Sequence, residues 1–495
     1  MWTLAVCLAL AACSAERSPP EPAGADAPNS VQWFDGALEA AFEQARAQNK
    51  PVLVYWGAVW CPYCEALKNT VFTRKDFIER SRAVIPVYLD GDLPQAQKWG
   101  VQFKVVGYPT LILFSPDGSE IARVAGGMDL EQYASILDRT LADERPIATV
   151  IAQVLDLDAQ PSAADCRRLA YHAWGLVEES DSELEKRASA LMVAAQRCGT
   201  VDDTAALRLS LLYLEARLGI ESGAIRDGEA PSPGLRDAVI ALRPVLRDDS
   251  QVSATLDVLV SLDSALYTVV SGLGEPFAAG FLRDWTDALT RAARDTRYGE
   301  SDRVLALAMA LQAQQRLSPE RKIDPTLAES VRQQVQAALA SKRDAGARAD
   351  IVNAARIVYS TLGDDDTLYD LLLAELPASP TPYYYMPTLA AIEERRGHPE
   401  KAIEWLAKAF AATPTPGARV RWGLRYVQGL IRLTPEDTAA IERAALEVAG
   451  AILERDAQLP PDPQRAKRLT DALAKWATTP ERKAVVAAVE RRLAT

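Results

Sequence analysis

The order of apolar and polar positions divides the chain into an α/β part and a long helical part. Within residues 31–142, a helical pattern at 38–45 precedes a buried-strand run at 52–56, a second helical stretch ending near residue 80 and a strand at 83–89. A hairpin at 110–114 and 121–125 and a helix at 129–141 are expected to follow. This order of strands and helices predicts a compact, layered α/β domain.

From residue 146 onward the strand patterns give way to helical ones joined by short turns. Leucines 207, 211, 214 and 218 share one face and precede Gly219, and similar stretches recur at 235–247, 251–270, 278–296, 302–316 and 326–341. Breaks rich in Gly and Pro at 219–234 and 271–276 predict internal boundaries, which divide the region into residues 146–270 and 277–495. The pattern predicts stacked helical hairpins, an all-α solenoid of the kind that presents a surface to a protein or peptide.

One hairpin, near residues 383–416, carries the spacing of a tetratricopeptide repeat. The matching positions are Leu389, Ala390, Ala402, Leu406, Ala409 and Pro414, with the inner turn at residues 397–400. Met386 and Glu393 occupy positions where that family usually has an aromatic residue, and the chain shows no second clean copy at the same period. A generic helical hairpin therefore stays open as the alternative.

The amino terminus begins with an apolar run that ends in Leu10-Ala11-Ala12-Cys13. The run is too short to span a bilayer and fits a signal peptide over residues 1–12. The tetrapeptide resembles the lipobox of bacterial lipoproteins, which implies that Cys13 is acylated. Residues 13–30 are rich in Pro, Ala and charge and predict a disordered tether. An ordinary cleaved signal peptide is the alternative. No Lys or Arg precedes the apolar run, so the positive charge expected there comes either from the α-amino group or from residues of a start upstream of Met1.

These features predict a place in the bacterial cell envelope: facing the periplasm and anchored by lipid, with the outer membrane as the favoured site. The net charge of −12, from 55 basic and 67 acidic residues, argues against a nucleic-acid partner. The two histidines, His172 and His398, are expected to be solvated and are assigned no role, and no metal site is predicted.

Four cysteines remain for the folded protein once Cys7 leaves with the signal and Cys13 takes the lipid. Cys166 and Cys198 each lie on the apolar stripe of a predicted helix. They are equidistant from the turn that the pattern predicts near Ser182. Residues equidistant from the turn of an antiparallel pair lie side by side, so we predict a structural disulfide between them. Two free buried thiols are the alternative.

The other two cysteines form a CxxC motif, Cys61 to Cys64, directly after the strand at 52–56. A cysteine at a helix N-terminus meets unpaired N–H groups and the positive end of the helix dipole, which favour its nucleophilic thiolate. The i, i+3 spacing places the second sulfur one turn away, where a disulfide can open and close. Pro62 suits the first turn of the helix because it needs no N–H partner there.

Over about residues 31–142 the chain resembles the thioredoxin superfamily. The resemblance rests on Trp60-Cys61-Pro62-Tyr63-Cys64 and Gly107-Tyr108-Pro109-Thr110, and residues 65–72 look like the subgroup that contains the C-terminal domain of the disulfide reductase DsbD. It implies that Cys61 attacks, that Cys64 resolves, and that Pro109 is a cis-proline facing them. It further implies that Tyr108 and Trp60 contact the substrate and that Pro62 and Tyr63 support the site.

The chain departs from the thioredoxin pattern at two positions. Tyr55 stands where thioredoxins carry a buried aspartate, and Glu65 follows the second cysteine where lysine is common, although Lys68 one turn later can offset the acid. The direction of electron flow is therefore open. Half of a zinc site and an inert structural disulfide are the alternatives for the motif itself.

The favoured function is a membrane-tethered thiol–disulfide oxidoreductase acting on exported proteins, whose helical region binds the partner. Its substrates would be protein thiols or disulfides, an unidentified upstream redox partner would serve it, and it needs no cofactor beyond the redox-active Cys61–Cys64 pair. The alternative is a lipoprotein scaffold with a non-catalytic thioredoxin-like domain.

Overall fold

The computed structural model describes residues 30–125, 130–176, 180–262, 264–318, 320–341, 345–454 and 463–494. The predicted signal peptide, the lipidation position Cys13 and nearly all of the predicted tether lie outside the described residues.

The first domain is built on a four-stranded sheet in the order β2-β1-β3-β4. Strand β1 (Val52–Gly57) pairs in parallel with β2 (Ile85–Asp90) and antiparallel with β3 (Thr110–Phe114), which pairs antiparallel with β4 (Glu120–Ala125). Every residue of β1 is buried, because helices cover both faces of the sheet. The sequence prediction of an α/β domain is correct.

The two faces of the sheet carry different helices. Helix α1 (Leu38–Gln48) and the aromatic end of α4 (Pro94–Gln102) pack on the face of Val52 and Val54. Helices α2 (Pro62–Thr70), α3 (Lys75–Ser81) and α5 (Leu130–Ala142) pack on the face of Leu53 and Tyr55. The latter is the face on which the CxxC motif lies.

The helices of this domain differ from the sequence prediction at two places. The stretch expected to run to residue 80 is two helices, α2 and α3, because the chain turns at 71–74 to bury Val71 and Phe72. Helix α4 was not predicted at all. Among its residues only Ala96 is buried, so its sequence carries little helical periodicity.

Everything after the first domain is helical in the described residues. The helices are α6 (Ile147–Leu155), α7 (Ala163–Ala170), η1 (Trp174–Leu176), α8 (Asp181–Cys198), α9 (Asp203–Arg226), α10 (Pro233–Leu246), α11 (Asp249–Leu259), α12 (Ala265–Gly272), α13 (Glu275–Ala292), α14 (Glu300–Leu317), α15 (Pro325–Ala340), α16 (Ala345–Leu362), α17 (Asp365–Glu375), η2 (Pro382–Tyr384), α18 (Met386–Arg395), α19 (Pro399–Ala411), α20 (Pro416–Leu433), α21 (Thr438–Leu453), α22 (Pro463–Trp476) and α23 (Pro480–Leu493). The predicted all-helical region is therefore correct as a class.

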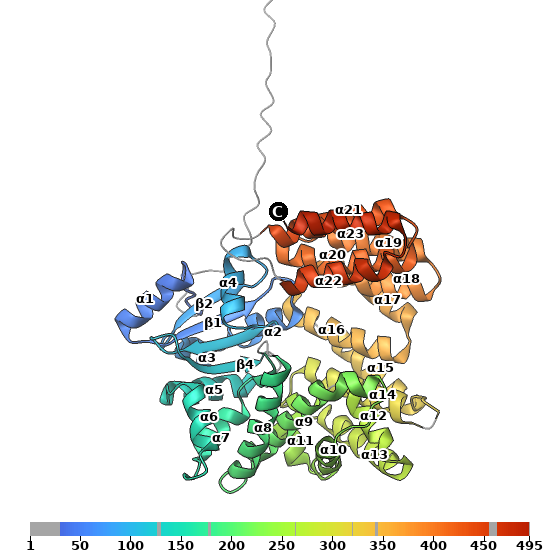
Figure 1. Cartoon of the computed structure of the whole chain (residues 1–495). Coiled ribbons are helices and arrows are strands. Elements are labelled where there is room, and N and C mark those ends of the chain that lie inside the picture. The colour runs from blue at the N-terminus through green and yellow to red at the C-terminus, as the bar shows by residue number, and fades with distance from the viewer. Residues whose placement is uncertain are drawn as a thin grey trace, which may run out of the picture.

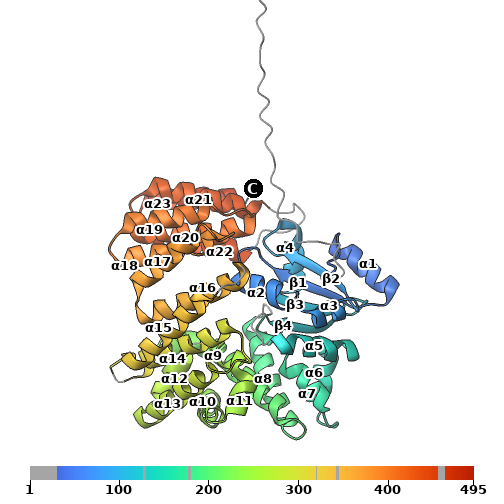
Figure 2. The same cartoon turned by 180° about the vertical axis from the view of Figure 1, so that it is seen from behind.

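The helical region curves around the first domain and returns to it (Figure 1). It starts at α6 and α7 beneath the sheet, and its later helices reach back until α16, α20 and α22 lie beside α2 and α4, as the opposite view also shows (Figure 2). One apolar core extends from Ile147 to Ala313, a second from Ala293 to Ile392 and a third from Phe410 to Val489. The CxxC helix α2 thus lies against α16, whereas the start of the helical region contacts β4 and α5.

Inside this region, the positions of glycine residues do not mark where helices end. Helix α9 continues through Gly219 to Arg226, because Gly219 faces open space and its lack of a side chain breaks no packing. The predicted helix 251–270 is two helices, α11 and α12. The break at 271–276 is a turn at Gly274, with φ +95°, inside the first core rather than between cores.

The segment 383–416 is a helical hairpin made by α18 and α19. Its inner turn has Gly397 at φ +77° and His398 directly before α19, with His398 exposed. The carboxylate of Glu393 is buried and lies 2.7 Å from His398 Nδ1 and 3.2 Å from an Arg396 nitrogen. These partners explain an acid at a position where a tetratricopeptide repeat usually has an aromatic ring.

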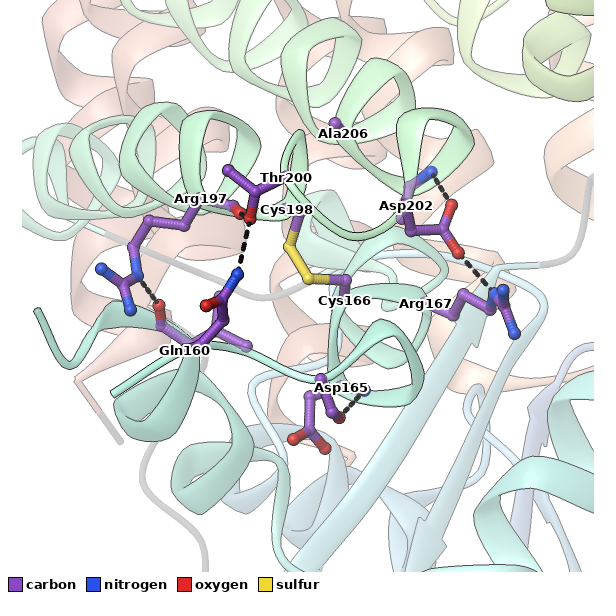
Figure 3. The surroundings of a disulfide bond; sticks show 12 residues. Gln160, Asp165, Cys166, Arg167, Arg197, Cys198, Thr200, Asp202 and Ala206 are labelled. Atoms are coloured by element: carbon purple, nitrogen blue, oxygen red, sulfur yellow. Dashed lines mark hydrogen bonds and ion pairs between the residues drawn. A yellow bond between two sulfur atoms is a disulfide. The ribbon is translucent and has the colours of Figure 1, made fainter. Parts of the chain in front are cut away.

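Cys166 and Cys198 form a disulfide, with the two Cα atoms 5.7 Å apart (Figure 3). The surroundings are not the symmetrical hairpin that the sequence suggested, because α7 ends at Ala170 and η1 precedes α8. Two arginines brace the bridge: Arg167 donates to Asp202 at 2.6 Å, and Arg197 donates to the carbonyl of Val154 at 2.5 Å.

His172 corrects the expectation of a solvated side chain. It is buried, it packs edge-on against Trp174, and its Nδ1 has no hydrogen-bond partner among the described residues. Burial lowers its pKa to about 4, so the ring is neutral at physiological pH. The sequence pattern continued the helix through His172, whereas α7 ends at Ala170 and His172 lies between α7 and η1.

Candidate active site at the CxxC motif

The end of β1 delivers Cys61 to the start of α2. Cys61 is the residue before the helix, with extended backbone, and its Sγ accepts a hydrogen bond from the Cys64 N–H at 3.2 Å. Pro62 occupies the first helical position. Both cysteines are free thiols in the structure, 3% and 0% exposed. The geometry therefore places Cys61 Sγ at the N-terminus of α2, where it accepts a hydrogen bond from one of the helix's first N–H groups.

Cys64 has the opposite environment. Its thiol lies in the apolar core beneath α2, and burial together with the neighbouring Cys61 raises its pKa well above the usual value. Cys64 is therefore a neutral thiol in the reduced protein.

Tyr55 fills the position where the sequence lacks the thioredoxin aspartate. Its ring is buried between Tyr88, at 5.2 Å, and Phe72, at 4.9 Å, and its hydroxyl donates to the Cys64 carbonyl at 3.3 Å. Burial raises the Tyr55 pKa, so this hydroxyl cannot serve as a base near neutral pH. It holds the α2 backbone instead.

Asp90 is a carboxyl group on the same face of the sheet as Tyr55, at the end of β2 opposite Gly57. Burial raises its pKa to about 6, with repulsion from Asp92 acting in the same direction. Glu65, the other departure, is paired with Lys68 at 2.9 Å, which neutralises the acid beside the motif. Sequence reasoning did not single out Asp90, although its place at the carboxyl end of a strand beside the motif was readable.

Pro109 lies after a cis peptide bond from Tyr108. Tyr108 and Trp60 are joined through Asp92, which accepts a hydrogen bond from the Tyr108 hydroxyl at 3.1 Å and another from Trp60 Nε1. The two rings meet edge to face at 5.5 Å. Asp92, 1% exposed, is a supporting residue that the sequence analysis missed, because an aspartate after a strand looks like an ordinary turn residue.

The helical region covers this site, which the sequence did not predict. Trp60 stacks on Tyr384 of η2 at 6.2 Å and meets Trp422 of α20 edge to face at 5.1 Å. The Gly417 N–H donates to the Asp92 carbonyl at 3.3 Å. On the other side Tyr63 lies near Asp350 of α16, and burial, followed by that carboxylate, raises the Tyr63 pKa to about 12. We call α16, η2 and α20 the cap.

A strand leading into CxxC at a helix start, with a cis-proline in the same domain, defines a thioredoxin-like domain. Residues 38–141 match the family described as Thioredoxin-like domain. The remainder of the chain lies outside that match.

Several curated proteins are similar to this domain. A thiol:disulfide interchange protein DsbD of Pseudomonas fluorescens is 33% identical over 100 residues, which cover 19% of this chain and 17% of that protein. The disulfide bond reductase DsbH of Chlamydia pneumoniae is 25% identical over 107 residues, which cover 19% of this chain and 63% of that protein. A solved DsbH oxidoreductase aligns with 20% identity and a TM-score of 0.21, over 23% of this chain and 86% of that one.

The chain thus matches only part of each of these relatives. Their names support a thiol–disulfide oxidoreductase kind of function for the domain that carries Cys61 and Cys64. Within the described ranges, no helix is both long and apolar enough to cross a bilayer, and no three His, Cys, Asp or Glu side chains are grouped so that they could hold a metal ion.

Proposed function

We propose that the protein is a membrane-tethered thiol–disulfide oxidoreductase that acts on exported proteins, with Cys61 as the attacking residue and Cys64 as the resolving residue. The observation that carries this proposal is the asymmetry of the pair. Cys61 Sγ accepts the Cys64 N–H at the start of α2, whereas the Cys64 thiol is buried and neutral. Attack on a disulfide requires a thiolate. Resolution of the mixed disulfide requires a second thiol that does not react before the first.

In the reducing direction, the Cys61 thiolate attacks one sulfur of a partner disulfide. The partner S–S bond breaks, a Cys61–partner disulfide forms, and the departing partner sulfur takes up a proton. Cys64 then loses its proton and attacks Cys61 Sγ, which releases the second partner thiol and leaves a Cys61–Cys64 disulfide. The oxidising direction is the same sequence reversed, and a separate redox protein would reset the pair in either case.

The lipid on Cys13 would hold the protein at the periplasmic side of the envelope, most simply at the outer membrane, and residues 13–30 would give the folded part its reach. The helical region would bind the partner protein. No cofactor is required, since the pair Cys61–Cys64 carries both electrons.

One observation favours a second candidate, a scaffold whose thioredoxin-like domain is an adaptor. Cys61 is only 3% exposed beneath the cap, and an adaptor does not need an accessible thiol. Retention of both cysteines and of Pro109 counts against it, since an adaptor requires none of the three.

Trapping separates the two candidates. In Cys64→Ser the mixed disulfide at Cys61 has no resolving thiol and should accumulate on a non-reducing gel of the cell envelope. In the matched control, Cys61→Ser, the remaining thiol is buried and should trap nothing. Equal bands, or none, in the two variants would leave only the adaptor.

The tether is tested separately by growth with labelled fatty acid. Label should enter the wild-type chain and be lost in Cys13→Ala, whereas Cys7→Ala should label normally. Unchanged labelling of Cys13→Ala would remove the lipid anchor from the proposal.

A further inference from the structure

Three arginines of the cap gather around the active-site aromatic residues. Arg421 lies over the Trp60 ring, with its guanidinium carbon 4.6 Å from the ring centroid. Arg425 lies one helical turn along α20, and Arg356 comes from α16. Burial raises the pKa of Tyr384, and the charges of Arg356 and Arg425 act in the opposite direction, so both guanidinium groups lie near its hydroxyl. Two helices far apart in sequence thus direct positive charge to one place beside the CxxC motif.

None of these arginines forms an ion pair with a carboxylate within the described part of the chain, although Asp92 and Asp350 lie close to the same aromatic residues. Arg421 and Arg425 are exposed and form no ion pair there. Arg356 donates to the Asn353 side chain at 2.9 Å, but its Nε is buried with no partner among the described residues. The Arg425 side chain is exposed over only part of its surface: desolvation of the covered part lowers its pKa, and repulsion from Arg421 and Arg356 adds to the effect. Arg432, on the same helix as Arg421 and Arg425, is instead paired with Glu394 at 2.7 Å.

Like charges held close together without a direct ion pair cost free energy, and a bound anion would recover part of it. This cluster of positive charge is a local exception, because the chain as a whole carries a net charge of −12. Arg356, Arg421 and Arg425 offer three separate guanidinium groups, each of which can pair with its own carboxylate. Three cationic groups favour a segment that bears several acidic side chains.

We infer that Arg356, Arg421 and Arg425 form a docking surface for an acidic, cysteine-bearing segment of the partner protein. The inference rests on the proposed function, because the segment would present its sulfur to Cys61. The carboxylates of the segment would pair with the arginines of the cap. The segment itself would lie where the cap now contacts Trp60. The exchange is the one already given: the segment's disulfide is reduced to two thiols and Cys61–Cys64 is oxidised.

The test uses the reduced full chain and short peptides, each dimerised through one cysteine flanked by glutamate, serine or lysine. Closure of the Cys61–Cys64 disulfide is followed by quenching with an alkylating reagent and mass spectrometry. The wild type should oxidise about tenfold faster with the glutamate peptide than with the serine peptide and slowest with the lysine peptide, and this preference should shrink in high salt. In Arg421→Gln/Arg425→Gln the ratio of glutamate to serine rates should fall to near one.

Arg432→Gln, on the same helix but paired with Glu394, is the matched control for loss of one positive charge, and it should keep the wild-type ratio. Equal wild-type rates with all three peptides, or a ratio unchanged in the double variant, would overturn the docking surface while leaving the proposed function intact. Faster oxidation by oxidised glutathione than by the glutamate peptide would overturn the assignment to a protein segment. No oxidation by any peptide would overturn the proposed function and this inference together.

Discussion

Trp60, the residue before the first cysteine of the CxxC motif, packs edge to face on Trp422 of the helical region, with ring centroids 5.1 Å apart and planes at 76°. The two residues belong to one apolar core, which also holds Cys61, Cys64 and Tyr383. The CxxC motif is therefore not displayed on an independent domain. Its access to a partner depends on how firmly the cap is closed.

Loosening the cap should uncover Cys61. A Cβ at Gly417 would lie 2.7 Å from Asp92 Oδ1 and 2.8 Å from Asp92 Cα, so Gly417→Ala must push α20 away from Asp92. Overpacking costs about 1–3 kcal/mol, and about 1.4 kcal/mol raises an open fraction tenfold. In a Cys64→Ser background, alkylation of Cys61 by N-ethylmaleimide should accelerate about tenfold.

Gly219→Ala is the matched control, since a Cβ there meets nothing within 4 Å. It should leave the alkylation rate unchanged. If Gly417→Ala reacts no faster than Gly219→Ala, the cap does not control access to Cys61.

The disulfide should stabilise the start of the helical region. Cys166 and Cys198 are 32 residues apart, and closing a loop of that size contributes about 2–4 kcal/mol through the unfolded state. Cys166→Ser/Cys198→Ser should lose that much free energy of unfolding in a urea titration. A chain starting at Ser30 that carries Cys61→Ser/Cys64→Ser should show no reactive thiol when unfolded without reductant, and two thiols would disprove the bridge.

Asp350 should make stability depend on pH. Burial raises its pKa from the ordinary 3.8 to about 6, and one of its oxygens has no partner among the described residues. The folded state then binds more protons than the unfolded state, so the group's contribution is present below pH 3.8 and is lost as pH rises through 6. Asp350→Asn should raise the free energy of unfolding by up to about 3 kcal/mol at pH 8 and by little at pH 4.

The comparison for Asp350 is Asp227→Asn, an exposed carboxylate after α9. It should change the free energy of unfolding by less than about 0.5 kcal/mol at either pH. A loss of stability in Asp350→Asn at pH 8 would show that the ionised carboxylate is satisfied in the folded protein.

The sequence located the CxxC motif within its α/β domain because the relevant signals are local. Cys61 and Cys64 follow a buried strand within a few residues, and the alternation at 110–114 and 121–125 reads directly as a hairpin. The pairing of Cys166 with Cys198 was likewise expected, although by a symmetry that α7 and η1 do not have.

The cap and Asp92 were missed because their meaning lies in contacts across the chain. Trp422 is 362 positions from Trp60, and nothing in the α20 sequence states which surface its tryptophan meets. Helix α4 was missed for the related reason that it buries little. Local patterns predict elements, whereas the closing of a long helical region over a site depends on the sum of many packing contacts.

The central claim is that Cys61 and Cys64 exchange electrons as a pair, and a redox titration tests it most directly. The protein is equilibrated with mixtures of reduced and oxidised dithiothreitol, its thiols are alkylated, and the mass of each cysteine-bearing peptide is measured. We predict that Cys61 and Cys64 convert together from dithiol to disulfide in a single two-electron transition, while Cys166–Cys198 stays oxidised across the same range. Two cysteines that remain thiols in every mixture would contradict the account.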